Sequence, residues 1–95
     1  MDEVPLDGRD WWIADDFYSA LLPALGAPPF HGRNLDVLWD SITCDDINSR
    51  KLPYRIVVFG IERMSPECKE LVRRFENLIH QAREAGPRIE LVLRS

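Results

Sequence analysis

The apolar residues of this chain come in short runs separated by polar turns, and three of these runs predict β-strands. Residues 4–6 (Val-Pro-Leu) precede an Asp-Gly turn, and their proline limits this strand to an edge or to a first strand position. Residues 54–59 are β-branched and aromatic and end at Gly60, so they form the clearest strand. Residues 88–93 form the last strand.

Three further segments carry apolar residues at helical spacing. The first begins at residue 14 or 15 and runs to about residue 25, where Gly26 and a nearby proline end it. The second covers about residues 34–43 and is followed by a polar loop over residues 44–51.

The third helix begins with a strong start signal, because Ser65 stands at the N-cap and Pro66 at the first helical position. An apolar stripe carries it to the stop at Gly86-Pro87. The strand, helix, strand order of the last 42 residues is a βαβ unit, which predicts a parallel strand pair with a right-handed crossover. The fold class that follows is α/β, with helices covering a small sheet.

The second helix carries acidic residues on the side opposite its apolar stripe. Asn34 can cap its first turn, and Asp36 and Asp40 lie one turn apart, with Trp39 at the border between the two faces. Two carboxylates at this spacing repel by about 0.2–0.5 kcal/mol, so stability alone does not favour them. The apolar stripe consists of Leu35, Leu38 and Ile42. This pattern fits either an ordinary solvated face or a surface for a basic partner.

The distribution of charge favours a basic partner. Residues 1–46 hold ten acidic residues against two basic ones, a net charge of −8, whereas residues 47–95 have a net charge of +4. Nucleic-acid binding requires a positive face, and the basic residues of the second half are scattered over a helix surface, so we expect no nucleic-acid partner. A negative half predicts electrostatic steering toward a positive protein.

Ninety-five residues suffice for one domain, which we expect to span residues 1–95. No apolar run reaches the length of a membrane span, and the acidic start of the chain lacks the features of a secretory signal. We therefore expect a cytoplasmic protein without a membrane partner. Cys44 and Cys68 are expected to be free thiols, and no metal or cofactor is expected, because ligand spacings are absent.

One stretch resembles a known family. The residues that carry the resemblance are Gly32, Asn34-Leu35-Asp36, Leu38-Trp39-Asp40 and Thr43. Together they are similar to the signature of the barstar family, intracellular inhibitors of barnase-like ribonucleases, and the order of elements agrees along nearly the whole chain. The resemblance implies a barstar-like fold, a small three-stranded parallel sheet packed with helices.

The resemblance also implies how such a protein works. By this resemblance, the acidic helix and the loop before it would enter the active-site groove of a basic ribonuclease, and Asp40 would occupy the phosphate-binding pocket. Asp36 and the aromatic pair Phe30-His31 frame that contact. A carboxylate suits this role because it can replace a substrate phosphate in a site built to bind anions.

The chain departs from the family pattern at several positions. Phe30 and His31 replace two tyrosines, and the loop over residues 44–51 is longer and lacks a tryptophan. The acid expected on the last helix aligns with Gln81, and Glu84 is the nearest carboxylate. These differences bear on the identity of the partner.

The sequence thus predicts a ribonuclease inhibitor of the immunity or antitoxin type, which is a monomer when free and binds a basic ribonuclease or nuclease toxin. The alternative is a barstar-like interaction module that binds another basic protein or toxin without ribonuclease inhibition. An enzyme is not expected, because no nucleophile with a base and no phosphate loop is present. The predicted partner-binding residues are Phe30, His31, Gly32, Asn34, Asp36, Trp39, Asp40, Thr43, Gln81 and Glu84.

Overall fold

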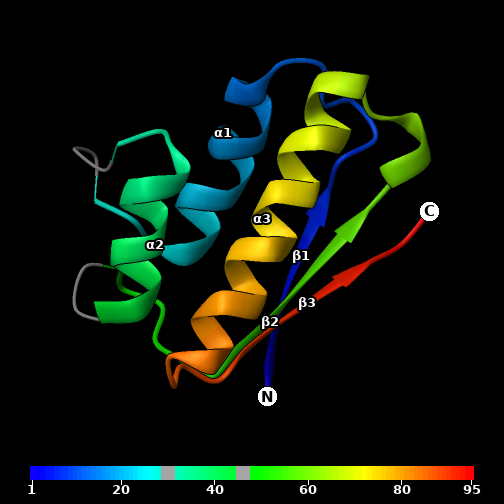
Figure 1. The fold of residues 1–95 in the computed structure, drawn as a ribbon. Helices are drawn as coiled ribbons and strands as arrows, with labels where there is room; N and C mark the ends of the chain where they lie inside the picture. The colour runs from blue at the N-terminus through cyan, green and yellow to red at the C-terminus, as the bar shows by residue number, and fades with distance from the viewer. Residues whose placement is uncertain (29–31, 45–47) are drawn as a thin grey trace.

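The computed structural model of the protein describes residues 1–28, 32–44 and 48–95. Within these residues, three parallel strands form one sheet in the order β1-β2-β3 (Figure 1). The strands are β1 (Asp2–Asp7), β2 (Tyr54–Phe59) and β3 (Ile89–Leu93). The α/β class and the three-stranded parallel sheet are therefore confirmed.

The helices lie between and beside these strands. They are α1 (Ala14–Leu25), α2 (Leu35–Cys44), the short 3-10 helix η1 (Ile61–Arg63) and α3 (Pro66–Glu84). In Figure 1, α3 crosses in front of the sheet, and α1 and α2 lie to its left. In the part of the chain described, none of the helices has the length and apolar character that crossing a bilayer requires.

Alternate residues of the strands form the floor of the core. Val4 of β1 and Ile56 of β2 are partners in the parallel register, and both are buried, as is Ile89 of β3. On the opposite face of the sheet, Arg55 joins Glu3 and Glu90 through ion pairs of 2.9 Å each. The sheet therefore has an apolar face toward the helices and a row of alternating charges on its other face.

An aromatic cluster joins α1 to α3 above this floor. Phe17 packs edge to face against Trp11, Tyr18 and Phe75, with ring centroids 5.0–5.5 Å apart. Such pairs contribute about 0.5–1.5 kcal/mol beyond the area that they bury. The cluster fixes the position of α3, which in turn supports α2.

The connection from β1 to α1 is held by two side chains, that of Asp16 in α1 and that of Ser65 at the N-cap of α3. The Ser65 hydroxyl caps α3 by accepting the N–H of Cys68 at 3.2 Å and donates to the carbonyl of Trp12 at 2.6 Å. Asp16 accepts the backbone N–H groups of Trp12 and Ile13 at 2.8 and 3.1 Å. The predicted N-cap of α3 is confirmed, and it also tethers a distant loop.

The two adjacent tryptophans of this connection differ in exposure. Tryptophans are large and highly buried on average, so both are expected to pack in the core or at its edge, and Trp11 is buried. For Trp12 that expectation is wrong, because its side chain is 70% exposed. Its backbone is held at both groups, because the N–H donates to the Asp16 carboxylate and the carbonyl accepts from the Ser65 hydroxyl.

The predicted bounds hold for most elements. Gly26 ends α1 in the left-handed conformation, with φ of 68°, and a Cβ at this position would overlap the Ser49 hydroxyl. The predicted first strand, residues 4–6, was too short. Pairing with β2 extends it at both ends, from Asp2 opposite Tyr54 to Asp7 opposite Phe59.

Candidate partner-binding site

The helix α2 is anchored by its apolar stripe and its cap. Leu38 and Ile42 are fully buried, and Leu35 packs partly buried against the core. The side-chain oxygen of Asn34 accepts the N–H of Val37 at 2.9 Å, which confirms the predicted cap. This anchoring determines which side of α2 faces outward.

A buried polar contact holds the segment after α2 against the helix. Asn48 is 2% exposed and its amide donates to the Ser41 hydroxyl at 3.3 Å, which itself donates to the carbonyl of Leu38 at 3.0 Å. Among the described residues, the Asn48 side-chain oxygen has no hydrogen-bond partner. Sequence analysis missed Asn48, because nothing in the local pattern marks this one loop amide as buried.

The two acidic residues of α2 are exposed. Within residues 1–28, 32–44 and 48–95, neither Asp36 nor Asp40 forms an ion pair. Trp39 between them is half-buried and packs against the core, as its predicted border position requires. The outward side of α2 thus presents two carboxylates beside a partly exposed indole.

Arg33, the basic residue nearest to this helix in sequence, binds residues of α1. Arg33 forms an ion pair with the Asp15 carboxylate at 2.7 Å and donates to the Asp15 carbonyl at 2.9 Å and the Ser19 hydroxyl at 2.6 Å. These contacts attach the start of α2 to α1. Because the Arg33 guanidinium is paired with Asp15 of α1, it does not pair with the carboxylates of α2.

Two other predicted residues have local roles. The Thr43 hydroxyl donates to the carbonyl of Trp39 at 2.8 Å, so it is bound within the helix. A Cβ at Gly32 would lie 3.0 Å from a methyl group of Val37, which leaves little room for a side chain there. Gly32 thus packs closely before the start of α2, and Thr43 is hydrogen-bonded near its end.

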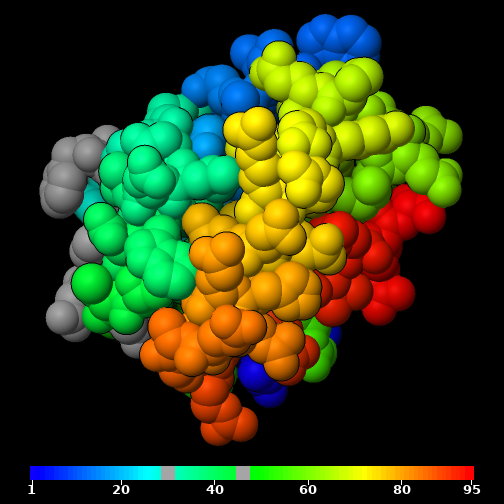
Figure 2. Space-filling model, in the orientation of Figure 1, coloured from blue at the N-terminus to red at the C-terminus, as the bar shows by residue number. Residues whose placement is uncertain are grey.

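A surface hollow of about 270 Å³ lies between α2 and α3. Figure 2 shows the surfaces of these helices side by side on one face of the molecule. The residues that line the hollow are Leu35, Asp36, Trp39, Arg74, Asn77, Leu78 and Gln81. Three predicted residues, Asp36, Trp39 and Gln81, therefore meet at one place. Asp40 and Glu84 are exposed but do not line it.

Sequence analysis predicted Gln81 of α3 in the site but missed Arg74 and Asn77 of the same helix. Arg74, Asn77 and Gln81 follow one another at intervals of three and four residues, which places them on one face of a helix. That spacing was visible in the sequence. What the sequence did not show is that this face lies opposite Asp36.

Part of the predicted site lies outside the described residues. Phe30 and His31 belong to the loop before α2, and their expected contact with a partner stays a prediction. Asp45 and Asp46 of the following loop lie outside them too. Among the described residues, no group of three or more His, Cys, Asp or Glu side chains is arranged to hold a metal ion.

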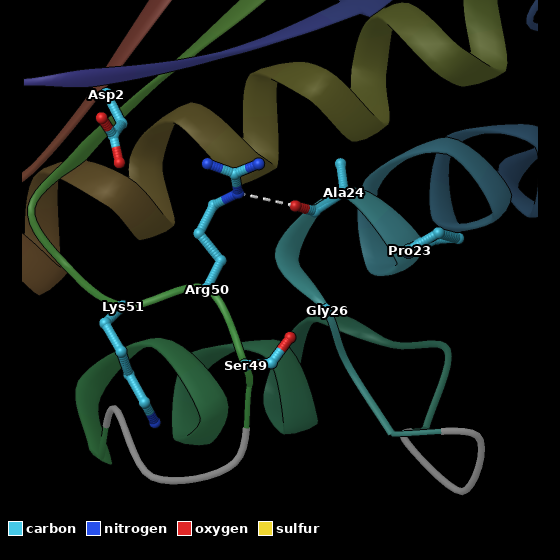
Figure 3. A pocket seen from close by; sticks show the side chains of 7 residues that line it. All are labelled: Asp2, Pro23, Ala24, Gly26, Ser49, Arg50 and Lys51. Atoms are coloured by element: carbon cyan, nitrogen blue, oxygen red, sulfur yellow. Dashed lines mark hydrogen bonds between the residues drawn. The ribbon is translucent and has the colours of Figure 1, made fainter.

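A larger hollow of about 530 Å³ lies at the C-terminal end of α1. Its lining includes Arg50, whose Nε donates to the carbonyl of Ala24 at 2.8 Å, and Figure 3 shows the guanidinium turned toward that carbonyl, with Lys51 pointing away. The last turn of α1 contains no basic residue of its own. Arg50 supplies the positive charge that stabilises free carbonyls at a helix end, a structural role.

Comparison with known proteins agrees with the resemblance seen in the sequence. The family model described as "Barstar (barnase inhibitor)" matches residues 1–94. A relative from Bacillus subtilis (strain 168), named "Putative ribonuclease inhibitor YrdF", is 40% identical over 43 residues. This match covers 45% of the present chain and 47% of the relative, so it spans about half of each protein.

Proposed function

We propose, because this chain belongs to the barstar family, that it is a protein inhibitor of a ribonuclease, of the immunity or antitoxin type. The inhibitor would act in the cytoplasm, as a monomer until it meets a basic nuclease. It would bind through α2 and the loop before it, and it would have no catalytic role of its own.

One observation carries this proposal. Asp36 and Asp40 are exposed on a well-anchored helix, and within the described residues no cation of the chain forms an ion pair with them. A ribonuclease active site binds the phosphates of RNA through cationic groups. A carboxylate held at a fixed position can occupy such a site with charge-assisted hydrogen bonds.

Inhibition would follow from occlusion of the groove. Asp40 would take the place of a substrate phosphate, and Asp36 would pair with a second cationic group nearby. The exposed part of Trp39 would supply apolar contact area beside these charges. Gly32, Asn34 and Thr43 would act indirectly, by fixing the start and the end of α2.

The charge of the chain would speed the encounter. Residues 1–46 have a net charge of −8, and this half includes α2. A negative field attracts a basic enzyme over distances up to about the Debye length of 8–10 Å at moderate salt. Long-range attraction raises the association rate more than it raises the final affinity.

The test uses purified barnase, the enzyme named in the family description. Cleavage of a fluorogenic RNA substrate is measured as the protein is added, and we expect activity to fall to background near one equivalent. The double variant Asp36→Asn/Asp40→Asn should lose most of this inhibition. Asp10→Asn, which removes a charge from an exposed residue outside α2, serves as the matched control.

The possible outcomes distinguish a ribonuclease inhibitor from a barstar-like interaction module. Binding without any loss of RNA cleavage would favour an interaction module for another basic protein. Neither binding nor inhibition at micromolar protein, with barnase and with other guanyl-specific ribonucleases, would contradict the proposal.

A further inference from the structure

The hollow between α2 and α3 carries charges of both signs. Asp36 borders it on the α2 side and Arg74 on the α3 side, with Trp39 and Leu78 also in the lining. The structure records no ion pair between Asp36 and Arg74. A partner that fills this hollow therefore meets a negative wall and a positive wall.

Arg74 is only weakly engaged within the chain. Its Nε lies 3.3 Å from a carboxylate oxygen of Glu70, and its side chain is 64% exposed. Glu70 is bound more closely by Arg73, whose Nε lies 2.9 Å from the other oxygen. In the described part of the chain, no hydrogen bond from the terminal nitrogens of Arg74 is recorded.

Arg74 also limits which partners fit. A surface that is uniformly basic would satisfy Asp36 and Asp40 but would place a cation against Arg74. Like charges brought together at an interface disfavour binding, whereas a guanidinium can form two parallel hydrogen bonds to one carboxylate. The complementary surface is basic opposite α2 and acidic opposite α3.

We propose that Arg74 is a specificity-determining residue, which selects nucleases with an acidic side chain on the rim of the groove that receives α2. This inference rests on the proposed function and deepens it. The neighbouring amides of Asn77 and Gln81 add neutral hydrogen-bonding groups, so Arg74 is the charged group of the α3 wall.

The test is a selection with displayed barnase in which surface positions around the active-site groove are randomised. The parent protein and the Arg74→Glu variant are used as separate baits. We expect the parent to enrich Asp or Glu at one or two rim positions, and Arg74→Glu to enrich Lys or Arg at the same positions. Selected clones are then measured against both proteins.

Each clone selected with the parent should bind Arg74→Glu about tenfold more weakly, and each clone selected with the variant should show the reverse preference. Arg73→Glu is the matched control, because Arg73 shares the Glu70 contact but does not line the hollow. The control should select the same rim residues as the parent.

Enrichment of the same rim residues by the parent and by Arg74→Glu would overturn the inference while leaving the proposed function intact. Higher affinity of Arg74→Glu than of the parent for the parent-selected clones would overturn it too. If Asp40→Ala binds all these clones as tightly as the parent does, the proposed function itself fails.

Discussion

The acidic residues of α1 and α3 differ from those of α2 in whether the chain itself pairs them. Near the start of α1 and α3, Asp16, Glu67 and Glu70 accept hydrogen bonds from the chain itself. On α2, Asp36 and Asp40 are exposed, and within the described residues they form no ion pair. Acids of the first kind stabilise the fold, and acids of the second kind are available to a partner.

The electrostatics of the first group follow from these contacts. The backbone N–H groups of Trp12 and Ile13 hold the pKa of Asp16 below its ordinary value. Arg73, and then Arg74, lower the pKa of Glu70 to about 2. Contacts within the folded chain therefore favour the charged forms of Asp16 and Glu70.

The largest expected effect is on binding, and it comes from Asp40→Ala. If Asp40 fills an anion site, its removal leaves cationic groups of the nuclease buried and unpaired, which costs about 3–5 kcal/mol of binding free energy. The melting temperature should change little, because Asp40 makes no ion pair within the described chain. Titration calorimetry and thermal unfolding of the same samples measure both quantities. Unchanged affinity would remove Asp40 from the mechanism.

The opposite result is expected for Ser65→Ala. This variant loses the cap of α3 and the 2.6 Å hydrogen bond to Trp12, so the free energy of unfolding should fall by about 1–2 kcal/mol. Affinity for the nuclease should stay within twofold of the parent, because Ser65 is buried and does not line the hollow between α2 and α3. Denaturant unfolding measures the stability. A variant that lost affinity but kept its stability would break the comparison between the two regions.

Much of the fold could be predicted from the sequence, because local signals agree with the tertiary structure. The serine and proline at the start of α3, the glycine after α1 and the β-branched run of β2 each correspond to the observed element. The ends of β1 could not be predicted, since residues as polar as Asp2 and Asp7 are held in the strand by pairing with β2.

The candidate site could be predicted from helical spacing only on the α2 side, and the family resemblance added Gln81 of α3. Asn34, Asp36 and Trp39 lie where helical spacing puts them, because one short helix determines their relative positions. Arg74 and Asn77 were missed, since their proximity to Asp36 depends on how α2 packs on α3. The exposure of Trp12 could not be predicted from its apolar ring, since its backbone is bound by Asp16 and by Ser65, which is distant in the sequence.

A third prediction concerns the rate of association. If the unpaired acids and the −8 half of the chain steer the encounter, the on-rate should fall about tenfold between low and moderately high salt, and the off-rate should change less. Stopped-flow mixing with barnase at several ionic strengths measures both rates. An on-rate that does not vary with salt would contradict a docking face made by charges.

The smallest expected effect is on the loss of stability at low pH, and it comes from Glu70→Gln. Because the pKa of Glu70 in the folded state is about 2, below its ordinary 4.5, its contribution is present above about pH 4.5 and is lost as pH falls toward 2. In a plot of melting temperature against pH, Glu70→Gln should therefore show a smaller slope between about pH 4.5 and 2 than the parent does. Asp36→Asn, which removes a carboxylate that forms no ion pair within the described residues, is the control. Equal slopes for the parent and Glu70→Gln would refute the role given to Glu70.

The central claim is that the acidic face of α2 and the adjoining wall of α3 form the binding surface. The most direct test is NMR spectroscopy of the labelled protein, in which backbone amide shifts are compared with and without one equivalent of barnase. We predict the largest changes within residues 35–44 and around residues 74–81, and little change at Trp12 and along β3. Changes confined to the β1–α1 connection or to the sheet, with α2 unaffected, would contradict the claim.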